Sequence, residues 1–157
     1  MLEINNKAPD FILTTDENEQ ISLAGLKGLN IVLYFYPKDD TPGCTKEARN
    51  FSDLIEEFKK NDTVIIGVSR DDIASHQKFR KKHDLSIRLA SDPEGEVLNK
   101  YGILAEKTMF GKKYIGVERS TFLIDKMGLI REAWYKVKVK DHAAEVLKAA
   151  VALRTSV

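Results

Sequence analysis

The residue with the clearest capacity for chemistry is Cys44, the only cysteine among the 157 residues. It ends the turn Thr41-Pro42-Gly43-Cys44, which follows the apolar run Ile31–Tyr36. Such a run is typical of a buried strand. After the turn, apolar residues recur at helical spacing: Ala48, Phe51, Leu54, Ile55 and Phe58. The pattern therefore predicts a strand, a tight turn and a helix whose first turn carries Cys44.

The residues of the turn support a helix start at this place. Pro42 suits a first helical turn, because its missing N–H is not needed there, and Thr41 is placed to be the N-cap. The free N–H groups and the dipole at a helix N-terminus favour negative charge. They would favour the thiolate of Cys44, which is the nucleophilic form. The alternative is that Cys44 is only a small buried hydrophobic residue.

These residues resemble a known family. Pro37, Thr41 and Cys44 fit the P-x-x-x-T-x-x-C signature of peroxiredoxins, and Y-P-K-D-D-T-P-G-C-T-K-E-A resembles the bacterioferritin-comigratory, PrxQ-like subfamily. Downstream, the segment Arg119–Asp125 resembles the strand that carries the family's active-site arginine. The resemblance covers essentially the whole chain. It implies a thioredoxin-like fold with an N-terminal β-hairpin extension, and a thiol-dependent peroxidase that acts in antioxidant defence.

The resemblance also implies a set of site residues around Cys44. Arg119 would stabilise the thiolate and hold the peroxide, for which its rigid fork of donors is suited. The Thr41 hydroxyl and the Cys44 N–H would bond the peroxide oxygens, and such donors resemble an oxyanion hole. Pro37 would shield the cysteine from water. From the residues alone, Thr41 could simply cap the helix, Pro37 could end a strand and Arg119 could lie at the surface.

Two further residues of this region are expected to support the site. Gly43 belongs to the turn before Cys44, and Glu47 lies one helical turn after it. Glu47 is either a solvated acid of the first turn or, by resemblance, the group that holds Arg119 in place.

The main departure from the family is at Arg49. PrxQ-like chains often carry a second, resolving cysteine five positions after the first, and here that position is Arg49. The helical interpretation pairs Arg49 with Asp53 at i,i+4. Without a second cysteine, the sulfenic acid formed at Cys44 would need an external thiol, either thioredoxin or a small thiol. No metal or organic cofactor is expected.

The histidines argue against two other kinds of site. His76, His83 and His142 are expected at the surface, and ~10 Å of helix separates the first two, so that they cannot share a metal. No cysteine stands near them, which leaves a zinc site unsupported. A Cys–His hydrolase would need one of them to activate Cys44, but none falls in a motif that demands it. A non-catalytic thioredoxin-fold interaction module is the other alternative.

Composition and charge fit a single domain, residues 1–157. Apolar residues make up 43% and charged residues 31% of the chain, which is ordinary for a globular protein. The net charge of +1 gives no reason to expect nucleic acid or an anionic membrane as a partner. Residues 1–11 lack the apolar core of a signal peptide, and one cysteine suits a reducing cytoplasm. We expect a monomer, because no apolar stripe is evident beyond the core faces.

The remaining pattern predicts an α/β sandwich with a mixed sheet flanked by helices. Strands are expected as a pair within Phe11–Leu23 around the turn Asp16–Glu19, at Ile31–Tyr36, at Thr63–Val68, at Ile87–Ala90, and as a hairpin formed by Thr121–Ile124 and Leu129–Tyr135. Helices are expected from the Cys44 turn to about Lys60, from Asp72 to His83, from Pro93 to Gly102, and from Asp141 to Arg154. Ala105–Val117, rich in Lys and Gly, is expected to be a loop.

Overall fold

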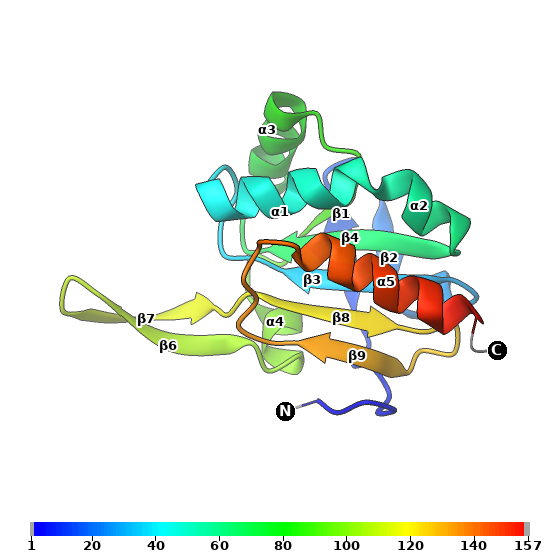
Figure 1. The fold of residues 1–157 in the computed structure, drawn as a ribbon. Coiled ribbons are helices and arrows are strands. Elements are labelled where there is room, and N and C mark those ends of the chain that lie inside the picture. The colour runs from blue at the N-terminus through cyan, green and yellow to red at the C-terminus, as the bar shows by residue number, and fades with distance from the viewer. Residues whose placement is uncertain (1, 156–157) are drawn as a thin grey trace.

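A seven-stranded mixed sheet forms the framework of the computed structural model, which describes residues 2–155 (Figure 1). From one edge to the other the strands are β2 (Gln20–Ser22), β1 (Ile12–Thr15), β5 (Arg88–Ser91), β4 (Thr63–Ser69), β3 (Asn30–Phe35), β8 (Ser120–Ile124) and β9 (Ile130–Trp134). Strands β3, β4 and β5 run parallel, and the other pairings are antiparallel. The expected mixed sheet and the N-terminal hairpin, β1–β2, are confirmed.

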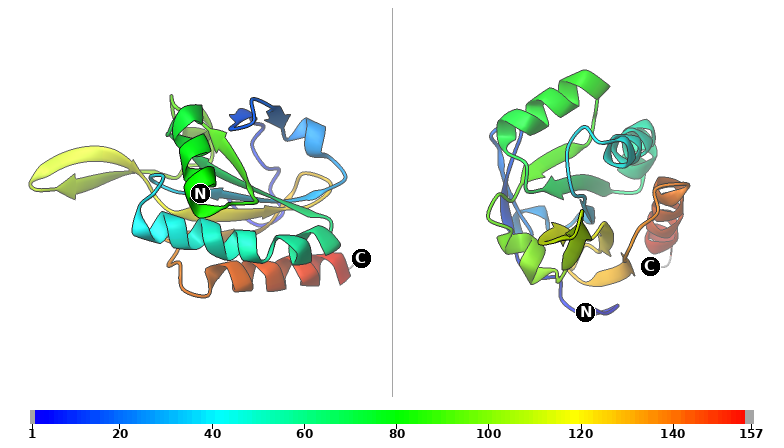
Figure 2. Two further views of the ribbon diagram at one scale, coloured as in Figure 1. Left: turned by 90° about the horizontal axis from the view of Figure 1, so that it is seen from above. Right: turned by 90° about the vertical axis from the view of Figure 1, so that its left-hand side faces the viewer.

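Helices cover both faces of this sheet (Figures 1 and 2). They are the 3-10 helix η1 (Ala24–Leu26) and the α-helices α1 (Pro42–Asp53), α2 (Ile55–Lys60), α3 (Ile73–His83), α4 (Glu96–Lys100) and α5 (His142–Thr155). All six residues of β3 are buried, and successive side chains point to opposite faces. Val32 and Tyr34 pack with residues of α1, α2, α3 and α5, whereas Ile31 and Leu33 pack with β1, β2 and α4. The strand that leads to Cys44 is therefore held from both sides.

Two helices differ from the sequence-based expectation. The long helix expected as far as Lys60 is divided at Leu54, whose backbone angles leave the helical range (φ −101°, ψ 7°). Asn50, Ser52 and Asp53 precede the break, and such residues compete with helical hydrogen bonds. The helix expected to begin at Pro93 begins instead at Glu96, because Pro93 lies in a turn closed by the Gly95 N–H to the Asp92 carbonyl.

The expected loop at Ala105–Val117 is wrong. Residues Leu104–Met109 and Lys112–Val117 form a two-stranded antiparallel hairpin, β6–β7, which projects from the body of the molecule (Figures 1 and 2). Phe110 and Gly111 at its tip both have positive φ, 52° and 77°. That geometry is the one that closes a two-residue hairpin. Phe-Gly is not a usual signal for this turn, so the sequence does not predict the hairpin.

No helix among the residues that the structure describes is both long and apolar enough to cross a membrane.

Candidate active site

Cys44 lies in the first turn of α1, where the chain leaves β3 and turns back over the sheet. Its side chain is buried among the residues of the face that α1 and α5 cover, and it is a free cysteine. Thr41 occupies the N-cap position, as expected, with an extended backbone (φ −97°, ψ 156°). Its side chain makes no capping bond, and the Thr41 Oγ1 donates to the Lys38 carbonyl at 2.9 Å. The hydroxyl therefore braces the turn, and the N-terminal N–H groups of α1 remain unsatisfied by it.

Arg119 reaches Cys44 from a distant part of the chain. It lies between β7 and β8, and Ser120 pairs with Phe35 at the end of β3. The guanidinium donates from Nη2 to the Cys44 Sγ at 3.3 Å and from Nη1 to the Glu47 Oε1 at 2.7 Å. Residues 75 positions apart in the sequence are thus joined through one side chain.

The electrostatics of this trio follow from burial and pairing. Burial raises the pKa of Glu47 to about 7, although Arg119 acts in the opposite direction. One of its oxygens, Oε2, is buried without a hydrogen-bond partner among the described residues. Burial lowers the pKa of Arg119, but Glu47 and Cys44 outweigh it, so that the pKa lies above its ordinary value. The guanidinium is therefore a fixed cation beside the sulfur.

Gly43 and Pro37 lie at the edges of the trio. A Cβ at Gly43 would be 3.2 Å from the Nη2 of Arg119, so the glycine leaves room for the guanidinium. Pro37 lies two residues after the end of β3 and is exposed to solvent. As the residue that follows Tyr36, it ends the strand because it has no N–H to donate.

The expectation that all three histidines lie at the surface is wrong for two of them. His76 and His142 are buried, whereas His83 is partly exposed and contacts the Asp40 carboxylate at 2.7 Å. His142 is within hydrogen-bond distance of the Thr121 Oγ1, at 2.8 Å, and its ring lies edge-on to Trp134. Burial lowers the pKa of His142 to about 4, so this imidazole is neutral at neutral pH. Neither buried histidine serves as a base for Cys44, whose polar partner is Arg119.

Among the described residues, no three side chains of His, Cys, Asp or Glu are grouped so that they could hold a metal ion.

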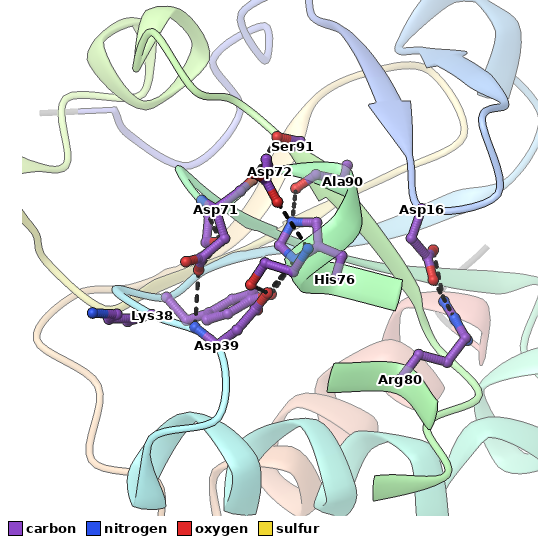
Figure 3. Close-up of polar contacts among 12 residues, drawn as sticks. Asp16, Lys38, Asp39, Asp71, Asp72, His76, Arg80, Ala90 and Ser91 are labelled. Carbon is purple, nitrogen blue, oxygen red and sulfur yellow. Dashed lines mark hydrogen bonds and ion pairs between the residues drawn. The ribbon is translucent and has the colours of Figure 1, made fainter. Parts of the chain in front are cut away.

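A second polar cluster near the cysteine was not anticipated from the sequence. Asp39, in the turn between β3 and α1, is buried and contacts His76 of α3 (Figure 3). Farther along α3, Arg80 forms an ion pair with the buried carboxylate of Asp16 (Figure 3). The only available signal was the occurrence of two adjacent acid pairs in turns, Asp39-Asp40 and Asp71-Asp72.

The fold and the cysteine–arginine site together are those of a peroxiredoxin. Residues 4–133 match the AhpC/TSA family, and the chain belongs to that family. Its similarity is to the Bcp group. Peroxiredoxin Bcp of Bacillus subtilis is 52% identical over 147 residues, which cover 94% of each chain. Peroxiredoxin Bcp of Xanthomonas campestris is 42% identical and covers 95% of this chain and 93% of its own.

Solved structures agree with this assignment. A structure of the Xanthomonas campestris bacterioferritin comigratory protein, described for its alkyl peroxide reduction, superposes with a TM-score of 0.89 at 40% identity and 98% coverage of both chains. A cysteine-to-serine mutant of PrxQ from Xylella fastidiosa gives a TM-score of 0.91 at 36% identity and 97% coverage of both. The expected thioredoxin-like peroxiredoxin fold is confirmed. The chain is a thiol peroxidase of the Bcp/PrxQ type with one cysteine, Cys44.

Proposed function

We propose that this chain reduces hydrogen peroxide and organic hydroperoxides in the cytoplasm, with Cys44 as the peroxidatic residue. The observation that carries the proposal is the Arg119 guanidinium, which bonds the sulfur of the only cysteine at 3.3 Å. The alkyl peroxide reduction described for the Xanthomonas campestris relative supports organic hydroperoxides as substrates. A free thiol that is never used in a structural disulfide fits a reducing compartment.

The chemistry begins with attack of the Cys44 thiolate on one peroxide oxygen. An S–O bond forms, the O–O bond breaks, and the leaving oxygen takes a proton to become water or an alcohol, which leaves Cys44 as sulfenic acid. Arg119 and the Cys44 N–H stabilise the charge that moves across the O–O bond, and Glu47 holds the guanidinium. The Thr41 hydroxyl, whose proton is donated to the Lys38 carbonyl, accepts a hydrogen bond from the O–H of the peroxide. Gly43 leaves room for Arg119, and Pro37 limits the access of water.

The sulfenic acid is then reduced by an external thiol, either thioredoxin or a small thiol. Its thiolate attacks the Cys44 sulfur and releases water, which gives a mixed disulfide. A second thiol attacks the reductant's sulfur, so that Cys44 is regenerated and the reductant leaves as a disulfide. A direct route within the chain is closed, because Cys44 is its only cysteine.

This route predicts the products of oxidation without a reductant. Arg49, at the position of the second cysteine in many relatives, donates to the His83 carbonyl at 2.9 Å and to Asp53 at 3.2 Å. We expect intact-mass spectra to show one added oxygen, then two or three with excess peroxide. Arg49→Cys should form an internal disulfide if α1 can unwind, since in an intact helix residues five apart lie ~140° apart around the axis. A stable oxidised wild type without any gain in mass would contradict this route.

We propose that the chain is a monomer. A mass from light scattering at twice the chain mass, in both redox states, would contradict this.

The central test compares the wild type with Cys44→Ser. We expect peroxide consumption with thioredoxin or a small thiol to vanish in the variant, because Cys44 is the only thiol of the chain and the sulfur bonded by Arg119. Circular dichroism should be unchanged, since serine is close to cysteine in size. Near-wild-type consumption by Cys44→Ser would contradict the proposal. A folded wild type whose thiol is inert to peroxide would instead indicate a non-catalytic interaction module.

A further inference from the structure

The turn at residues 37–41 joins β3 to α1 and thereby fixes where the Cys44 helix begins. Four of its residues are exposed or half-buried, as expected for a turn, but Asp39 is buried. A buried carboxylate costs free energy unless it is paired and hydrogen-bonded. Its partners are therefore the feature that decides what this turn is attached to.

The Asp39 carboxylate is surrounded by donors from α3 and from Tyr36, the residue that follows β3. It accepts from the Tyr36 hydroxyl at 2.6 Å and from the Ser75 hydroxyl at 2.8 Å, and it lies 2.7 Å from the Nδ1 of His76. The Asp39 backbone N–H donates to the Asp71 carboxylate at 2.8 Å, as Figure 3 shows. The turn is thus bonded to the first turn of α3 and to the segment that precedes it.

The hydrogen bonds of His76 indicate a charged imidazole. Its Nε2 lies 3.0 Å from the Ala90 carbonyl of β5, which can only accept, so Nε2 carries a proton (Figure 3). Its Nδ1 faces the Asp39 carboxylate, which already accepts two hydroxyl bonds. Burial lowers the pKa of His76, but Asp39 outweighs it and the pKa lies above its ordinary value. The groups that face this ring are Asp39 and Tyr36 beside β3, Asp71 before α3 and the carbonyl on β5.

We propose that Asp39 and His76 are positioning residues of the peroxidase site. Their buried ion pair fastens the 37–41 turn to α3 and β5, and so holds Thr41 and the N-terminal N–H groups of α1 in place around Cys44. Neither residue touches the sulfur. This inference rests on the proposed function, because the geometry that it maintains is that of the peroxide pocket. Misplacement of a reacting group by ~1 Å can cost ~100-fold in rate. A substitution at Asp39 that displaces the turn should therefore slow the oxidation of Cys44 by peroxide.

The adjacent residue provides a matched control. Asp40 is exposed and also reaches α3, where it contacts the Lys82 Nζ and the His83 Nε2, each at 2.7 Å. Exposed ion pairs are screened by water and contribute little. Asp39→Asn and Asp40→Asn therefore remove the same charge from neighbouring positions of one turn, but only the first removes a buried anchor.

The experiment measures two rates for each variant: oxidation of Cys44 by peroxide, and its alkylation by a neutral reagent at a pH where the thiolate is fully formed. For Asp39→Asn we expect peroxide oxidation to fall about 10- to 100-fold, and alkylation to change less than about twofold. For Asp40→Asn both rates should stay within about twofold of the wild type. Equal loss of both rates, or an unchanged peroxide rate in a folded Asp39→Asn, would overturn the proposal.

Two further measurements apply even if Asp39→Asn fails to fold. The ¹⁵N shifts of the wild-type His76 ring should be those of an imidazolium at neutral pH, and a neutral ring would overturn the ion pair.

Ser75→Ala removes one donor to the Asp39 carboxylate but leaves both charges of the pair. We expect about a two- to fivefold loss of the peroxide rate alone; no loss would contradict the proposal. A wild type inactive toward peroxide would overturn the proposed function as well, whereas an active wild type with an unchanged Asp39→Asn overturns only this inference.

Discussion

Two polar regions flank the segment that carries Cys44, and each contains a buried pair of an acidic and a basic side chain. They differ in what these side chains contact. On the β8 side, Arg119 and Glu47 form a buried ion pair whose cation bonds the sulfur at 3.3 Å. On the α3 side, Asp39 of the turn and His76 of α3 form a buried ion pair whose further contacts are with the Tyr36 and Ser75 hydroxyls and with the Ala90 carbonyl of β5. Under the proposals made above, the first region acts on the sulfur itself, and the second acts on the position of the backbone that surrounds it.

The comparison shows why neither ion pair should be interpreted mainly as a source of stability. Desolvation of two charges costs as much as their attraction returns in many buried pairs. Here each pair leaves a visible sign of that cost, since burial raises the pKa of Glu47 and acts to lower the pKa of His76. Their common feature, under the proposals made above, is that each holds one component of the site in place.

The largest effect is expected from Arg119→Met, which removes the charge and keeps most of the length. Loss of one such donor typically costs ~100- to 1,000-fold in rate, and we expect a loss of that order in oxidation by peroxide. Alkylation at high pH should suffer less, because the thiolate is then formed in any case. Equal loss in both reactions would mean that Arg119 only supports the fold.

A medium effect, on stability, is expected from Glu47→Gln. The pKa of Glu47 is about 7 in the folded chain against an ordinary value of 4.5, so the folded state binds this proton more tightly than the unfolded state. The wild type should therefore lose stability as the pH rises from 4.5 to about 7. Above that range, Glu47→Gln should be more stable than the wild type by about 1–3 kcal/mol.

Urea unfolding across this pH range measures the difference, and the acidic end provides the control, because both proteins carry an uncharged side chain there. The peroxide rate should fall about tenfold at the same time, since Arg119 loses its charged partner. A variant that is less stable than the wild type at alkaline pH would show that the ion pair outweighs desolvation.

The smallest effect is expected from Gly43→Ala. The new Cβ would lie 3.2 Å from the Nη2 of Arg119, so the guanidinium must shift by a few tenths of an ångström. We expect a loss of about two- to fivefold in the peroxide rate, while helix propensity raises stability by about 0.5 kcal/mol. A lower peroxide rate together with a higher stability would show that this substitution acts through Arg119, on the β8 side of the site, and not by weakening the turn on the α3 side. A rate equal to that of the wild type would show that Arg119 tolerates the shift.

The sequence predicted the charged region better than the positioning region, and the reason is physical. A cysteine at a helix start, with an arginine before a buried strand, can be recognised from residue types and from its resemblance to a family. Asp39 and His76 could not, because a polar residue in a turn or on a helix is usually solvated. The burial of Asp39 depends on donors from α3, a helix that begins 34 residues later.

The fold could be predicted to a similar extent. The prediction was wrong where long-range packing or turn geometry determines the structure. Strands β3 and β4 were evident as continuous apolar runs, which are typical of strands covered on both faces. Hairpin β6–β7 was missed because its residues are mostly exposed and its turn, Phe110-Gly111, carries an unusual residue at positive φ. The sequence does not predict the burial of His142, because that burial depends on contacts of α5 with Thr121 and Trp134.

Trp134 gives the molecule an optical property that follows from its place in the fold. It is the only tryptophan, it pairs with Thr121 across β8 and β9, and it donates from Nε1 to Glu145 of α5 at 3.2 Å. Its fluorescence therefore reports whether α5 is docked on the sheet, on the side of Cys44 away from α3. A substitution at Asp39 that slows the enzyme while the emission spectrum stays constant has changed the turn and not the fold. The chain thus carries an internal fluorophore that distinguishes a local change in the turn from a change in the packing of the fold, in the same sample as the rate measurement.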